Sequence, residues 1–207
     1  MLPSPIEKFI EIFSKLPGVG PRQATRLAFY FINSGKDKLD DTARAINNLK
    51  SLKLCAQCFA PHLNTGNFCD ICKDPKRDKR IIAVVEKETD QISLEKTKKF
   101  KGIYLILGEL SKSGVLENIQ KLRLNHIKSF IQKEFNSPSA SSGQGQAEEI
   151  ILAISPTSYG DLNALVLIQE LRPFAKKITR LGQGIPRGGE IEFADEDTLG
   201  SALDRRV

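Results

Sequence analysis

Residues 55–72 read CAQCFAPHLNTGNFCDIC and hold all four cysteines of the 207-residue chain: Cys55, Cys58, Cys69 and Cys72. Two Cys-x-x-Cys pairs separated by ten residues offer the four thiolates of a tetrahedral zinc site. Four protein ligands leave no open position for water or substrate, so we predict one structural zinc ion per chain. A redox-active cysteine pair and an iron–sulfur cluster are the alternatives. His62, inside the segment, is predicted not to bind the metal.

The chain before the cysteines is predicted to be helical. Apolar residues at helical spacing predict a first helix over residues 5–15, opened by a capping box at Ser4-Pro5-Ile6-Glu7. A second helix is expected from Pro21 to about residue 33. A third is expected over about 41–53, capped by Asp40 or Asp41.

The first two helices flank Leu16-Pro17-Gly18-Val19-Gly20, the pattern of a helix-hairpin-helix. Gly18 and Gly20 let the backbone turn tightly beside a phosphate, and the start of the next helix attracts an anion. Arg22 and Arg26, four residues apart on one helix face, could reach the same DNA backbone. The formal charge of +6 agrees with an anionic partner. Residues 1–53 are therefore a predicted sequence-independent DNA-binding region, the alternative being an ordinary helical hairpin with solvated arginines.

The chain after the cysteines changes composition near residue 79. Apolar runs predict buried strands at 81–85, 103–107 and 150–154, and amphipathic segments predict helices at 90–99, 117–135 and 161–172. This alternation predicts a multidomain α/β protein: a cysteine arm at 54–78, a parallel sheet at 79–175 and a short β/α tail at 176–207. The tail is predicted to hold a strand at 178–181, a glycine-rich loop at 182–189, a strand at 190–194 and a short helix after Asp195. Residues 136–146 are predicted to be a surface loop.

Carboxylates follow two of the predicted strands. Glu86 ends the first strand, and Asp161 comes shortly after the strand at 150–154. The carboxyl ends of parallel strands gather ligand sites in open α/β sheets, so these side chains are candidates for magnesium or for a partner. Asp161 is equally consistent with a helix cap.

Several classes of protein are disfavoured. The sequence has neither a P-loop nor a Gly-x-Ser-x-Gly elbow, and no apolar run reaches the roughly 18–20 residues of a membrane span. The charged N-terminal segment differs from a signal peptide. We therefore expect a cytoplasmic protein without a membrane partner.

The order of these parts, together with one C-terminal run, resembles the RecR family of bacterial recombination mediators. The run comprises Thr179-Arg180-Leu181 and then GIPRGGEIEFADEDTL at 184–199, and the resemblance covers essentially the whole chain. It implies a Toprim domain that serves as a docking surface, without catalytic turnover. It also implies a ring-like dimer or tetramer, built through the N- and C-terminal regions and associated with the nucleoid. Members act in DNA repair with RecO, and sometimes RecF, to promote RecA loading onto single-stranded DNA covered by single-stranded-DNA-binding protein.

Matching motif to motif, the resemblance places Arg22 and Arg26 at the family's DNA-facing positions and Glu86 at the Toprim glutamate. The departure lies at Ser155-Pro156-Thr157-Ser158-Tyr159-Gly160-Asp161, where the family reads Asn-Pro-Thr-x-Glu-Gly-Glu. Tyr159 thus replaces a carboxylate, which weakens the rival hypothesis of a Toprim nuclease or primase that uses Glu86 and Asp161 with magnesium. A zinc-bearing transcription regulator would need a base-reading helix distinct from the hairpin helix, and the sequence offers none.

Overall fold

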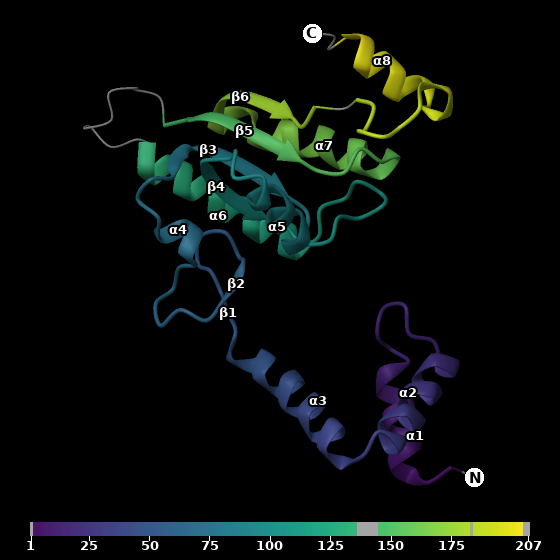
Figure 1. The fold of residues 1–207 in the computed structure, drawn as a ribbon. Helices are drawn as coiled ribbons and strands as arrows, with labels where there is room; N and C mark the ends of the chain where they lie inside the picture. Colours follow the sequence, from purple (N-terminus) through teal and green to yellow (C-terminus); the bar gives the residue numbers. More distant parts are fainter. Residues whose placement is uncertain (1, 136–144, 183, 205–207) are drawn as a thin grey trace. The chain divides into compact units, whose positions relative to one another are not determined.

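The computed structural model describes residues 2–135, 145–182 and 184–204 (Figure 1). The chain divides into two compact units, Met1–Leu52 and Lys53–Val207.

The N-terminal unit consists of helices. They are α1 (Ser4–Phe13), α2 (Pro21–Asn33) and α3 (Lys36–Asn48), followed by a 3-10 turn (Leu49–Ser51). Phe9 joins α1 to α2, because its ring lies edge-on to Phe31 with centroids 6.0 Å apart. The predicted first and second helices are confirmed.

Two predictions about helix ends in this unit are wrong. Helix α1 begins at Ser4 with Pro3 in the N-cap position, so Ser4 does not cap it. Helix α3 begins at Lys36 rather than near residue 41, because Gly35 adopts a φ of 88° and turns the chain directly from α2 into α3. The aspartates proposed as caps, Asp40 and Asp41, lie within the helix.

The C-terminal unit begins with the cysteine arm and continues into an α/β sheet. The arm contains β1 (Lys53–Leu54), β2 (Pro61–His62) and the short helix α4 (Asp70–Lys73). The sheet has the order β4-β3-β5-β6 with all neighbours parallel, as predicted. Its strands are β3 (Asp78–Val85), β4 (Gly102–Ile106), β5 (Ala147–Ala153) and β6 (Ala175–Arg180).

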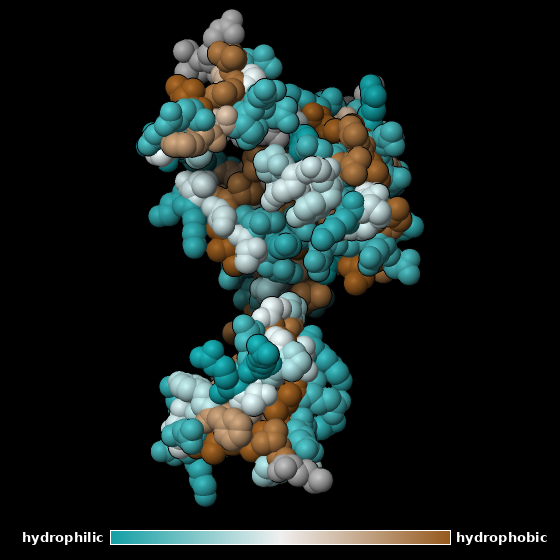
Figure 2. All heavy atoms as spheres, turned by 90° about the vertical axis from the view of Figure 1, so that its right-hand side faces the viewer, coloured by the Kyte–Doolittle hydropathy of each residue, from teal (hydrophilic) through white to brown (hydrophobic). Residues whose placement is uncertain are grey.

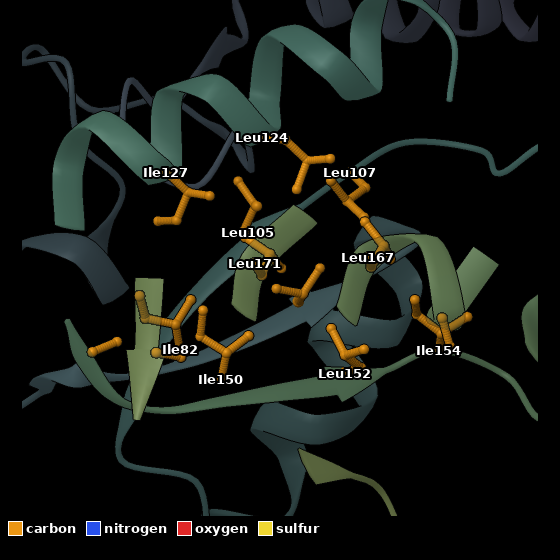
Figure 3. Packing of buried hydrophobic residues seen from close by; sticks show 14 of the residues in the cluster. Ile82, Leu105, Leu107, Leu124, Ile127, Ile150, Leu152, Ile154, Leu167 and Leu171 are labelled. Atoms are coloured by element: carbon orange, nitrogen blue, oxygen red, sulfur yellow. The ribbon is translucent and has the colours of Figure 1, made fainter. Parts of the chain in front are cut away.

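The main core lies on one face of this sheet. Helices α6 (Asn118–Phe135) and α7 (Ser158–Leu171) cover that face, and α5 (Glu88–Lys96) lies on the other (Figure 1). Figure 3 shows Leu124 and Ile127 of α6 and Leu167 of α7 directed toward strand residues such as Leu105 and Leu152. Strand β3 is the centre of the sheet, since Val84 lies opposite both Leu105 and Leu152. The prediction that the apolar runs form strands buried on both faces is therefore confirmed.

The C-terminal segment corrects one further prediction. Residues 190–194 do not form a strand: Ile191–Phe193 is a 3-10 turn in which the Phe193 amide donates to the Glu190 carbonyl at 3.2 Å. The alternating apolar side chains suggested a strand, yet Ile191 is 69% exposed and Phe193 79%. The helix predicted after Asp195 is confirmed as α8 (Glu196–Asp204). Of the loop predicted at 136–146, residues 136–144 lie outside the described residues.

Candidate metal centre and nucleic-acid interface

The four cysteines converge at one point of the arm. Their sulfur atoms all lie within 4.8 Å of one another, and Cys55, Cys58 and Cys69 are buried. A tetrahedral zinc–thiolate site with bonds of about 2.3 Å places its sulfurs about 3.8 Å apart, so sulfurs within 4.8 Å of one another are close to the spacing that one ion requires. The arm can therefore hold a metal ion.

The arm favours the thiolate form at Cys55, whereas hydrogen bonds among the same thiols raise the pKa of Cys58 and Cys72. The backbone amides of Gln57 and Cys69 donate to the Cys55 sulfur at 3.4 and 3.3 Å. Hydrogen bonds from the thiols of Cys58, Cys69 and Cys72 lower the pKa of Cys55. A metal ligand must be deprotonated, so these contacts favour Cys55 as a ligand.

The histidine of the arm has a different environment. His62 is buried, and its Nδ1 accepts a hydrogen bond from the Asn64 amide at 3.1 Å. Within the described residues, the four cysteines are the only group of three or more His, Cys, Asp or Glu side chains close enough to share one metal ion. His62 is not a member of that group.

A charged network ties the base of the arm to the sheet. The guanidinium of Arg77 pairs with the carboxylate of Glu95 and also donates to the Gly102 carbonyl at 3.3 Å. Tyr104 donates its hydroxyl hydrogen to Glu95 at 2.9 Å. The hydrogen bond from Arg77 lowers the pKa of Glu95, while burial and then the bond to Glu95 raise the pKa of Tyr104. Sequence spacing did not predict this network, because no spacing rule connects residues that are 9, 18 and 25 positions apart.

The hairpin between α1 and α2 has the geometry that its glycines permit. Gly18 adopts a φ of 74°, a left-handed conformation that costs a side-chain-bearing residue about 1–2 kcal/mol. Gly20 caps α2, with its amide donating to the Gln23 side chain at 3.4 Å, and Pro21 takes the first helical position. Helix α2 therefore starts at the end of a tight, exposed turn, with its positive end open to an anion.

Both predicted DNA-binding arginines are exposed on α2. Among the described residues, no carboxylate lies within ion-pair distance of Arg22 or Arg26. By contrast, Arg44 in the same unit pairs with Asp41 at 2.5 Å. Arg22 and Arg26 thus keep their positive charge available to a partner.

Glu86 is used within the fold. It is 4% exposed, and its Oε1 accepts a hydrogen bond from the amide of Leu110 at 3.2 Å. The Lys87 ammonium lies 3.9 Å from the same oxygen. Glu86 therefore holds the loop that follows β4 at the carboxyl edge of the sheet.

Asp161 lies at the same edge and is not a helix cap. Thr157 caps α7, because its side chain accepts from the Gly160 amide at 3.1 Å, and Asp161 lies in the first turn. The carboxylate of Asp161 pairs with Arg180 of β6 at 2.6 Å. A hollow of about 570 Å³ beside it is also lined by Asp195 and Asp197 of the C-terminal segment. Spacing in the sequence could not have placed these two aspartates next to Asp161.

No helix in the described part of the chain combines the length and the apolar character needed to cross a membrane.

Comparison with known proteins agrees with this arrangement of parts. The model "RecR, helix-hairpin-helix" matches residues 6–50, the Toprim domain model matches 80–182, and "RecR, C-terminal" matches 184–207. A Recombination protein RecR from Chloroflexus aggregans is 35% identical over 208 residues, covering 100% of this chain and 95% of the relative. The RecR proteins of Myxococcus xanthus and Synechococcus elongatus are 36% and 38% identical, covering 100% and 98% of this chain and 98% and 95% of their own. On this similarity and this domain order, the chain belongs to the RecR family of recombination proteins.

Proposed function

We propose that this protein is a recombinational-repair mediator that binds DNA as a ring-like oligomer and has no catalytic turnover. The observation that carries the proposal is the glycine hairpin. Gly18 and Gly20 lead into helix α2, and two arginines follow that have no ion-pair partner in the described part of the chain. Such a surface contacts the phosphate backbone and not base edges, so binding tolerates many sequences, on single- and double-stranded DNA alike. We assign DNA contact to Gly18, Gly20, Arg22 and Arg26.

The exposed apolar surface of the N-terminal unit supports an oligomer. Ala24 and Ala28 are its only buried residues in the described part of the chain, whereas Ile12, Ile32 and Leu49 are 51%, 54% and 63% exposed. Figure 2 shows such apolar side chains on the surface of this unit. A unit with so little core gains stability when a second copy covers its apolar side chains.

The C-terminal segment gives the same indication. Ile191, Phe193 and Leu203 are each more than 60% exposed, and α8 has no buried residue. We propose that both ends of the chain are contact regions in a dimer or tetramer. Each copy then adds one small basic surface, and affinity arises from several such surfaces on one DNA molecule.

The metal is proposed to be one structural zinc ion per chain, held by the four cysteine sulfurs. When bound, zinc would supply a cross-link that replaces the hydrophobic core of the arm. We divide the chain accordingly: hairpin region at 1–53, zinc arm at 54–78, Toprim domain at 79–175 and oligomerisation tail at 176–207.

The carboxyl edge of the sheet, around Glu86 and Asp161, is proposed as the surface for RecO, or for RecF. Docking there would serve RecA loading onto single-stranded DNA covered by single-stranded-DNA-binding protein, in the cytoplasm at the nucleoid. The competing function at this edge is a magnesium-dependent Toprim enzyme. The docking function is favoured because Glu86 and Asp161 already bind Leu110 and Arg180, and Tyr159 stands where the family has a carboxylate.

Light scattering at two salt concentrations, with zinc counted in the same sample, tests the proposal first. We expect a mass near four subunits, or a salt-dependent shift between dimer and tetramer, with one zinc per chain. A zinc-bearing monomer under all conditions would contradict it. Magnesium-dependent cleavage or synthesis on DNA that is lost in Glu86→Gln would support the enzyme instead.

A further inference from the structure

A hollow lies beside helix α2, and neither the hairpin glycines nor Arg22 line it. The hollow has a volume of about 380 Å³ and is lined by Val19, Gln23, Arg26, Leu27 and Tyr30. All five residues belong to the N-terminal unit. Ligand pockets begin at about 300 Å³, so the space suits one small planar group more than an extended ligand.

The spacing of these residues explains why they meet. Gln23, Leu27 and Tyr30 follow one another at intervals of four and three, and Arg26 lies four residues before Tyr30, so all of them share one side of the helix. Val19 adds an apolar side chain from the hairpin turn. Tyr30 is 49% exposed, so part of its ring remains open to a ligand.

The lining combines apolar, aromatic and cationic groups. The Lys38 ammonium of α3 lies 5.0 Å from the Tyr30 ring centroid, so a second positive charge of this unit lies against the same ring. Cations next to an exposed aromatic ring are the usual elements of single-stranded nucleic-acid sites, where bases stack on rings and phosphates meet the charges. An ordinary apolar contact with a protein would need neither Arg26 in the lining nor Lys38 against the ring.

We propose that this hollow receives one unstacked base of single-stranded DNA, stacked on Tyr30, with an adjacent phosphate on Arg26. The inference rests on the proposed DNA binding and adds a preference for single strands over duplex DNA. The bases of a duplex do not expose their faces to such a ring. Stacking is tolerant of sequence since every base has a π face, so the site adds affinity for single strands without sequence selection.

The absence of tryptophan from the sequence makes a direct test possible. Tyr30→Trp introduces a single indole, and its fluorescence is followed in the full-length protein as a single-stranded thymidine oligonucleotide is added. The matched ligand is an abasic strand of the same length and charge. We expect the thymidine strand to quench the indole and the abasic strand to leave it nearly unchanged.

Affinity measurements give a second readout. Tyr30→Ala should weaken binding of the thymidine strand about tenfold, which lies in the range for stacking of one base on an aromatic ring. The affinity for the abasic strand should not change. Phe29→Ala is the control, because Phe29 is exposed on the same helix but does not line the hollow. Light scattering on each variant shows whether the oligomer is intact.

The outcomes separate the base site from the DNA function. Equal binding of both strands by wild type and Tyr30→Ala, with loss of binding in Arg26→Ala, overturns base stacking and leaves the phosphate-binding hairpin in place. No effect of Arg26→Ala on either strand contradicts the proposed function itself. An indole signal that depends on protein concentration and not on DNA would show that a second copy covers the hollow, which also overturns the inference.

Discussion

The backbone carbonyl of Cys58 accepts a hydrogen bond from the amide of Ile106, 3.0 Å away. Ile106 is the last residue of β4, an outer strand of the sheet, and its carbonyl accepts from the Arg123 guanidinium at 3.0 Å. Unpaired edge groups of a strand are a template for pairing with another chain. The cysteine arm therefore covers an edge of the sheet, and its integrity matters beyond the arm itself.

Loss of the metal site should consequently expose a strand edge. Cys58→Ser removes one ligand, and we expect insoluble or unfolded protein with less than one zinc per chain, since structural zinc sites contribute roughly 10–16 kcal/mol of apparent binding free energy at neutral pH. Metal content, circular dichroism and the soluble fraction measure the effect. Thr65→Ala, an exposed change in the same arm, should leave all three at wild-type values. Normal folding and assembly of Cys58→Ser without zinc would refute the structural role.

Phe59 anchors the same contact at a conformational cost. Its φ is 65°, and its ring lies against His126, with centroids 5.4 Å apart, and beneath the guanidinium of Arg123. Phe59→Ala keeps the strained φ and loses the ring packing, so we expect a loss of about 3 kcal/mol in the free energy of unfolding. Phe59→Gly loses the same packing but relieves the backbone, and should be about 1 kcal/mol more stable than Phe59→Ala.

Denaturant unfolding of the zinc-loaded variants compares the two. At a position without strain, a glycine variant is ordinarily less stable than an alanine variant. A higher free energy of unfolding for Phe59→Ala than for Phe59→Gly would therefore show that the φ of Phe59 carries no strain.

Local patterns predicted the elements of this protein better than the contacts between them. The strand residues Val84 and Leu105 were evident from apolar runs because a strand buried on both faces needs no polar side chains. The cysteine cluster was evident because its two Cys-x-x-Cys pairs have the spacing of metal ligands. The strand predicted at 190–194 was wrong, although Ile191 and Phe193 alternate with polar residues. Alternation leads to a strand only where a neighbouring strand supplies hydrogen bonds, and the described residues provide none here.

The candidate site follows the same division. Arg22 and Arg26 were predicted from a motif of adjacent residues, whereas the Arg180 partner of Asp161 and the Arg77 network depend on which distant segments the sheet brings together. Such pairs are properties of the topology, and a single sequence read by spacing does not contain them.

The ion pair between Arg77 and Glu95 predicts a pH dependence. Because Arg77 lowers the pKa of Glu95 below its ordinary value of 4.5, the pair stabilises the folded state fully above that value. Its contribution is lost as the pH falls through the lowered pKa of the folded state. Glu95→Gln should therefore be less stable than wild type at pH 7, on the order of 1–2 kcal/mol for this partly exposed pair, and the difference should shrink as the pH falls below 4.5.

The free energy of unfolding is measured for wild type and for Glu95→Gln across this pH range, and the two values are subtracted. Acid effects on the metal site cancel in this difference because both proteins have the same cysteines. Glu117→Gln, an exposed carboxylate, is the control and should track wild type. A difference that is constant from pH 7 to 3 would show that the charge of Glu95 is not what stabilises the pair.

Salt dependence distinguishes phosphate contact at the hairpin from a general effect of charge. If Arg22 and Arg26 each contact one phosphate, Arg22→Ala and Arg26→Ala should each reduce the slope of log K against log salt by about 1 per engaged subunit on duplex DNA, and somewhat less on single strands. Arg44→Ala removes the same charge from the same unit, but Arg44 is paired with Asp41, so its slope should stay at the wild-type value. Fluorescence anisotropy of labelled DNA at several salt concentrations measures all three slopes. Equal slopes for wild type, Arg22→Ala and Arg26→Ala would show that DNA binds elsewhere on the molecule, because released counterions count the phosphates that a protein actually neutralises.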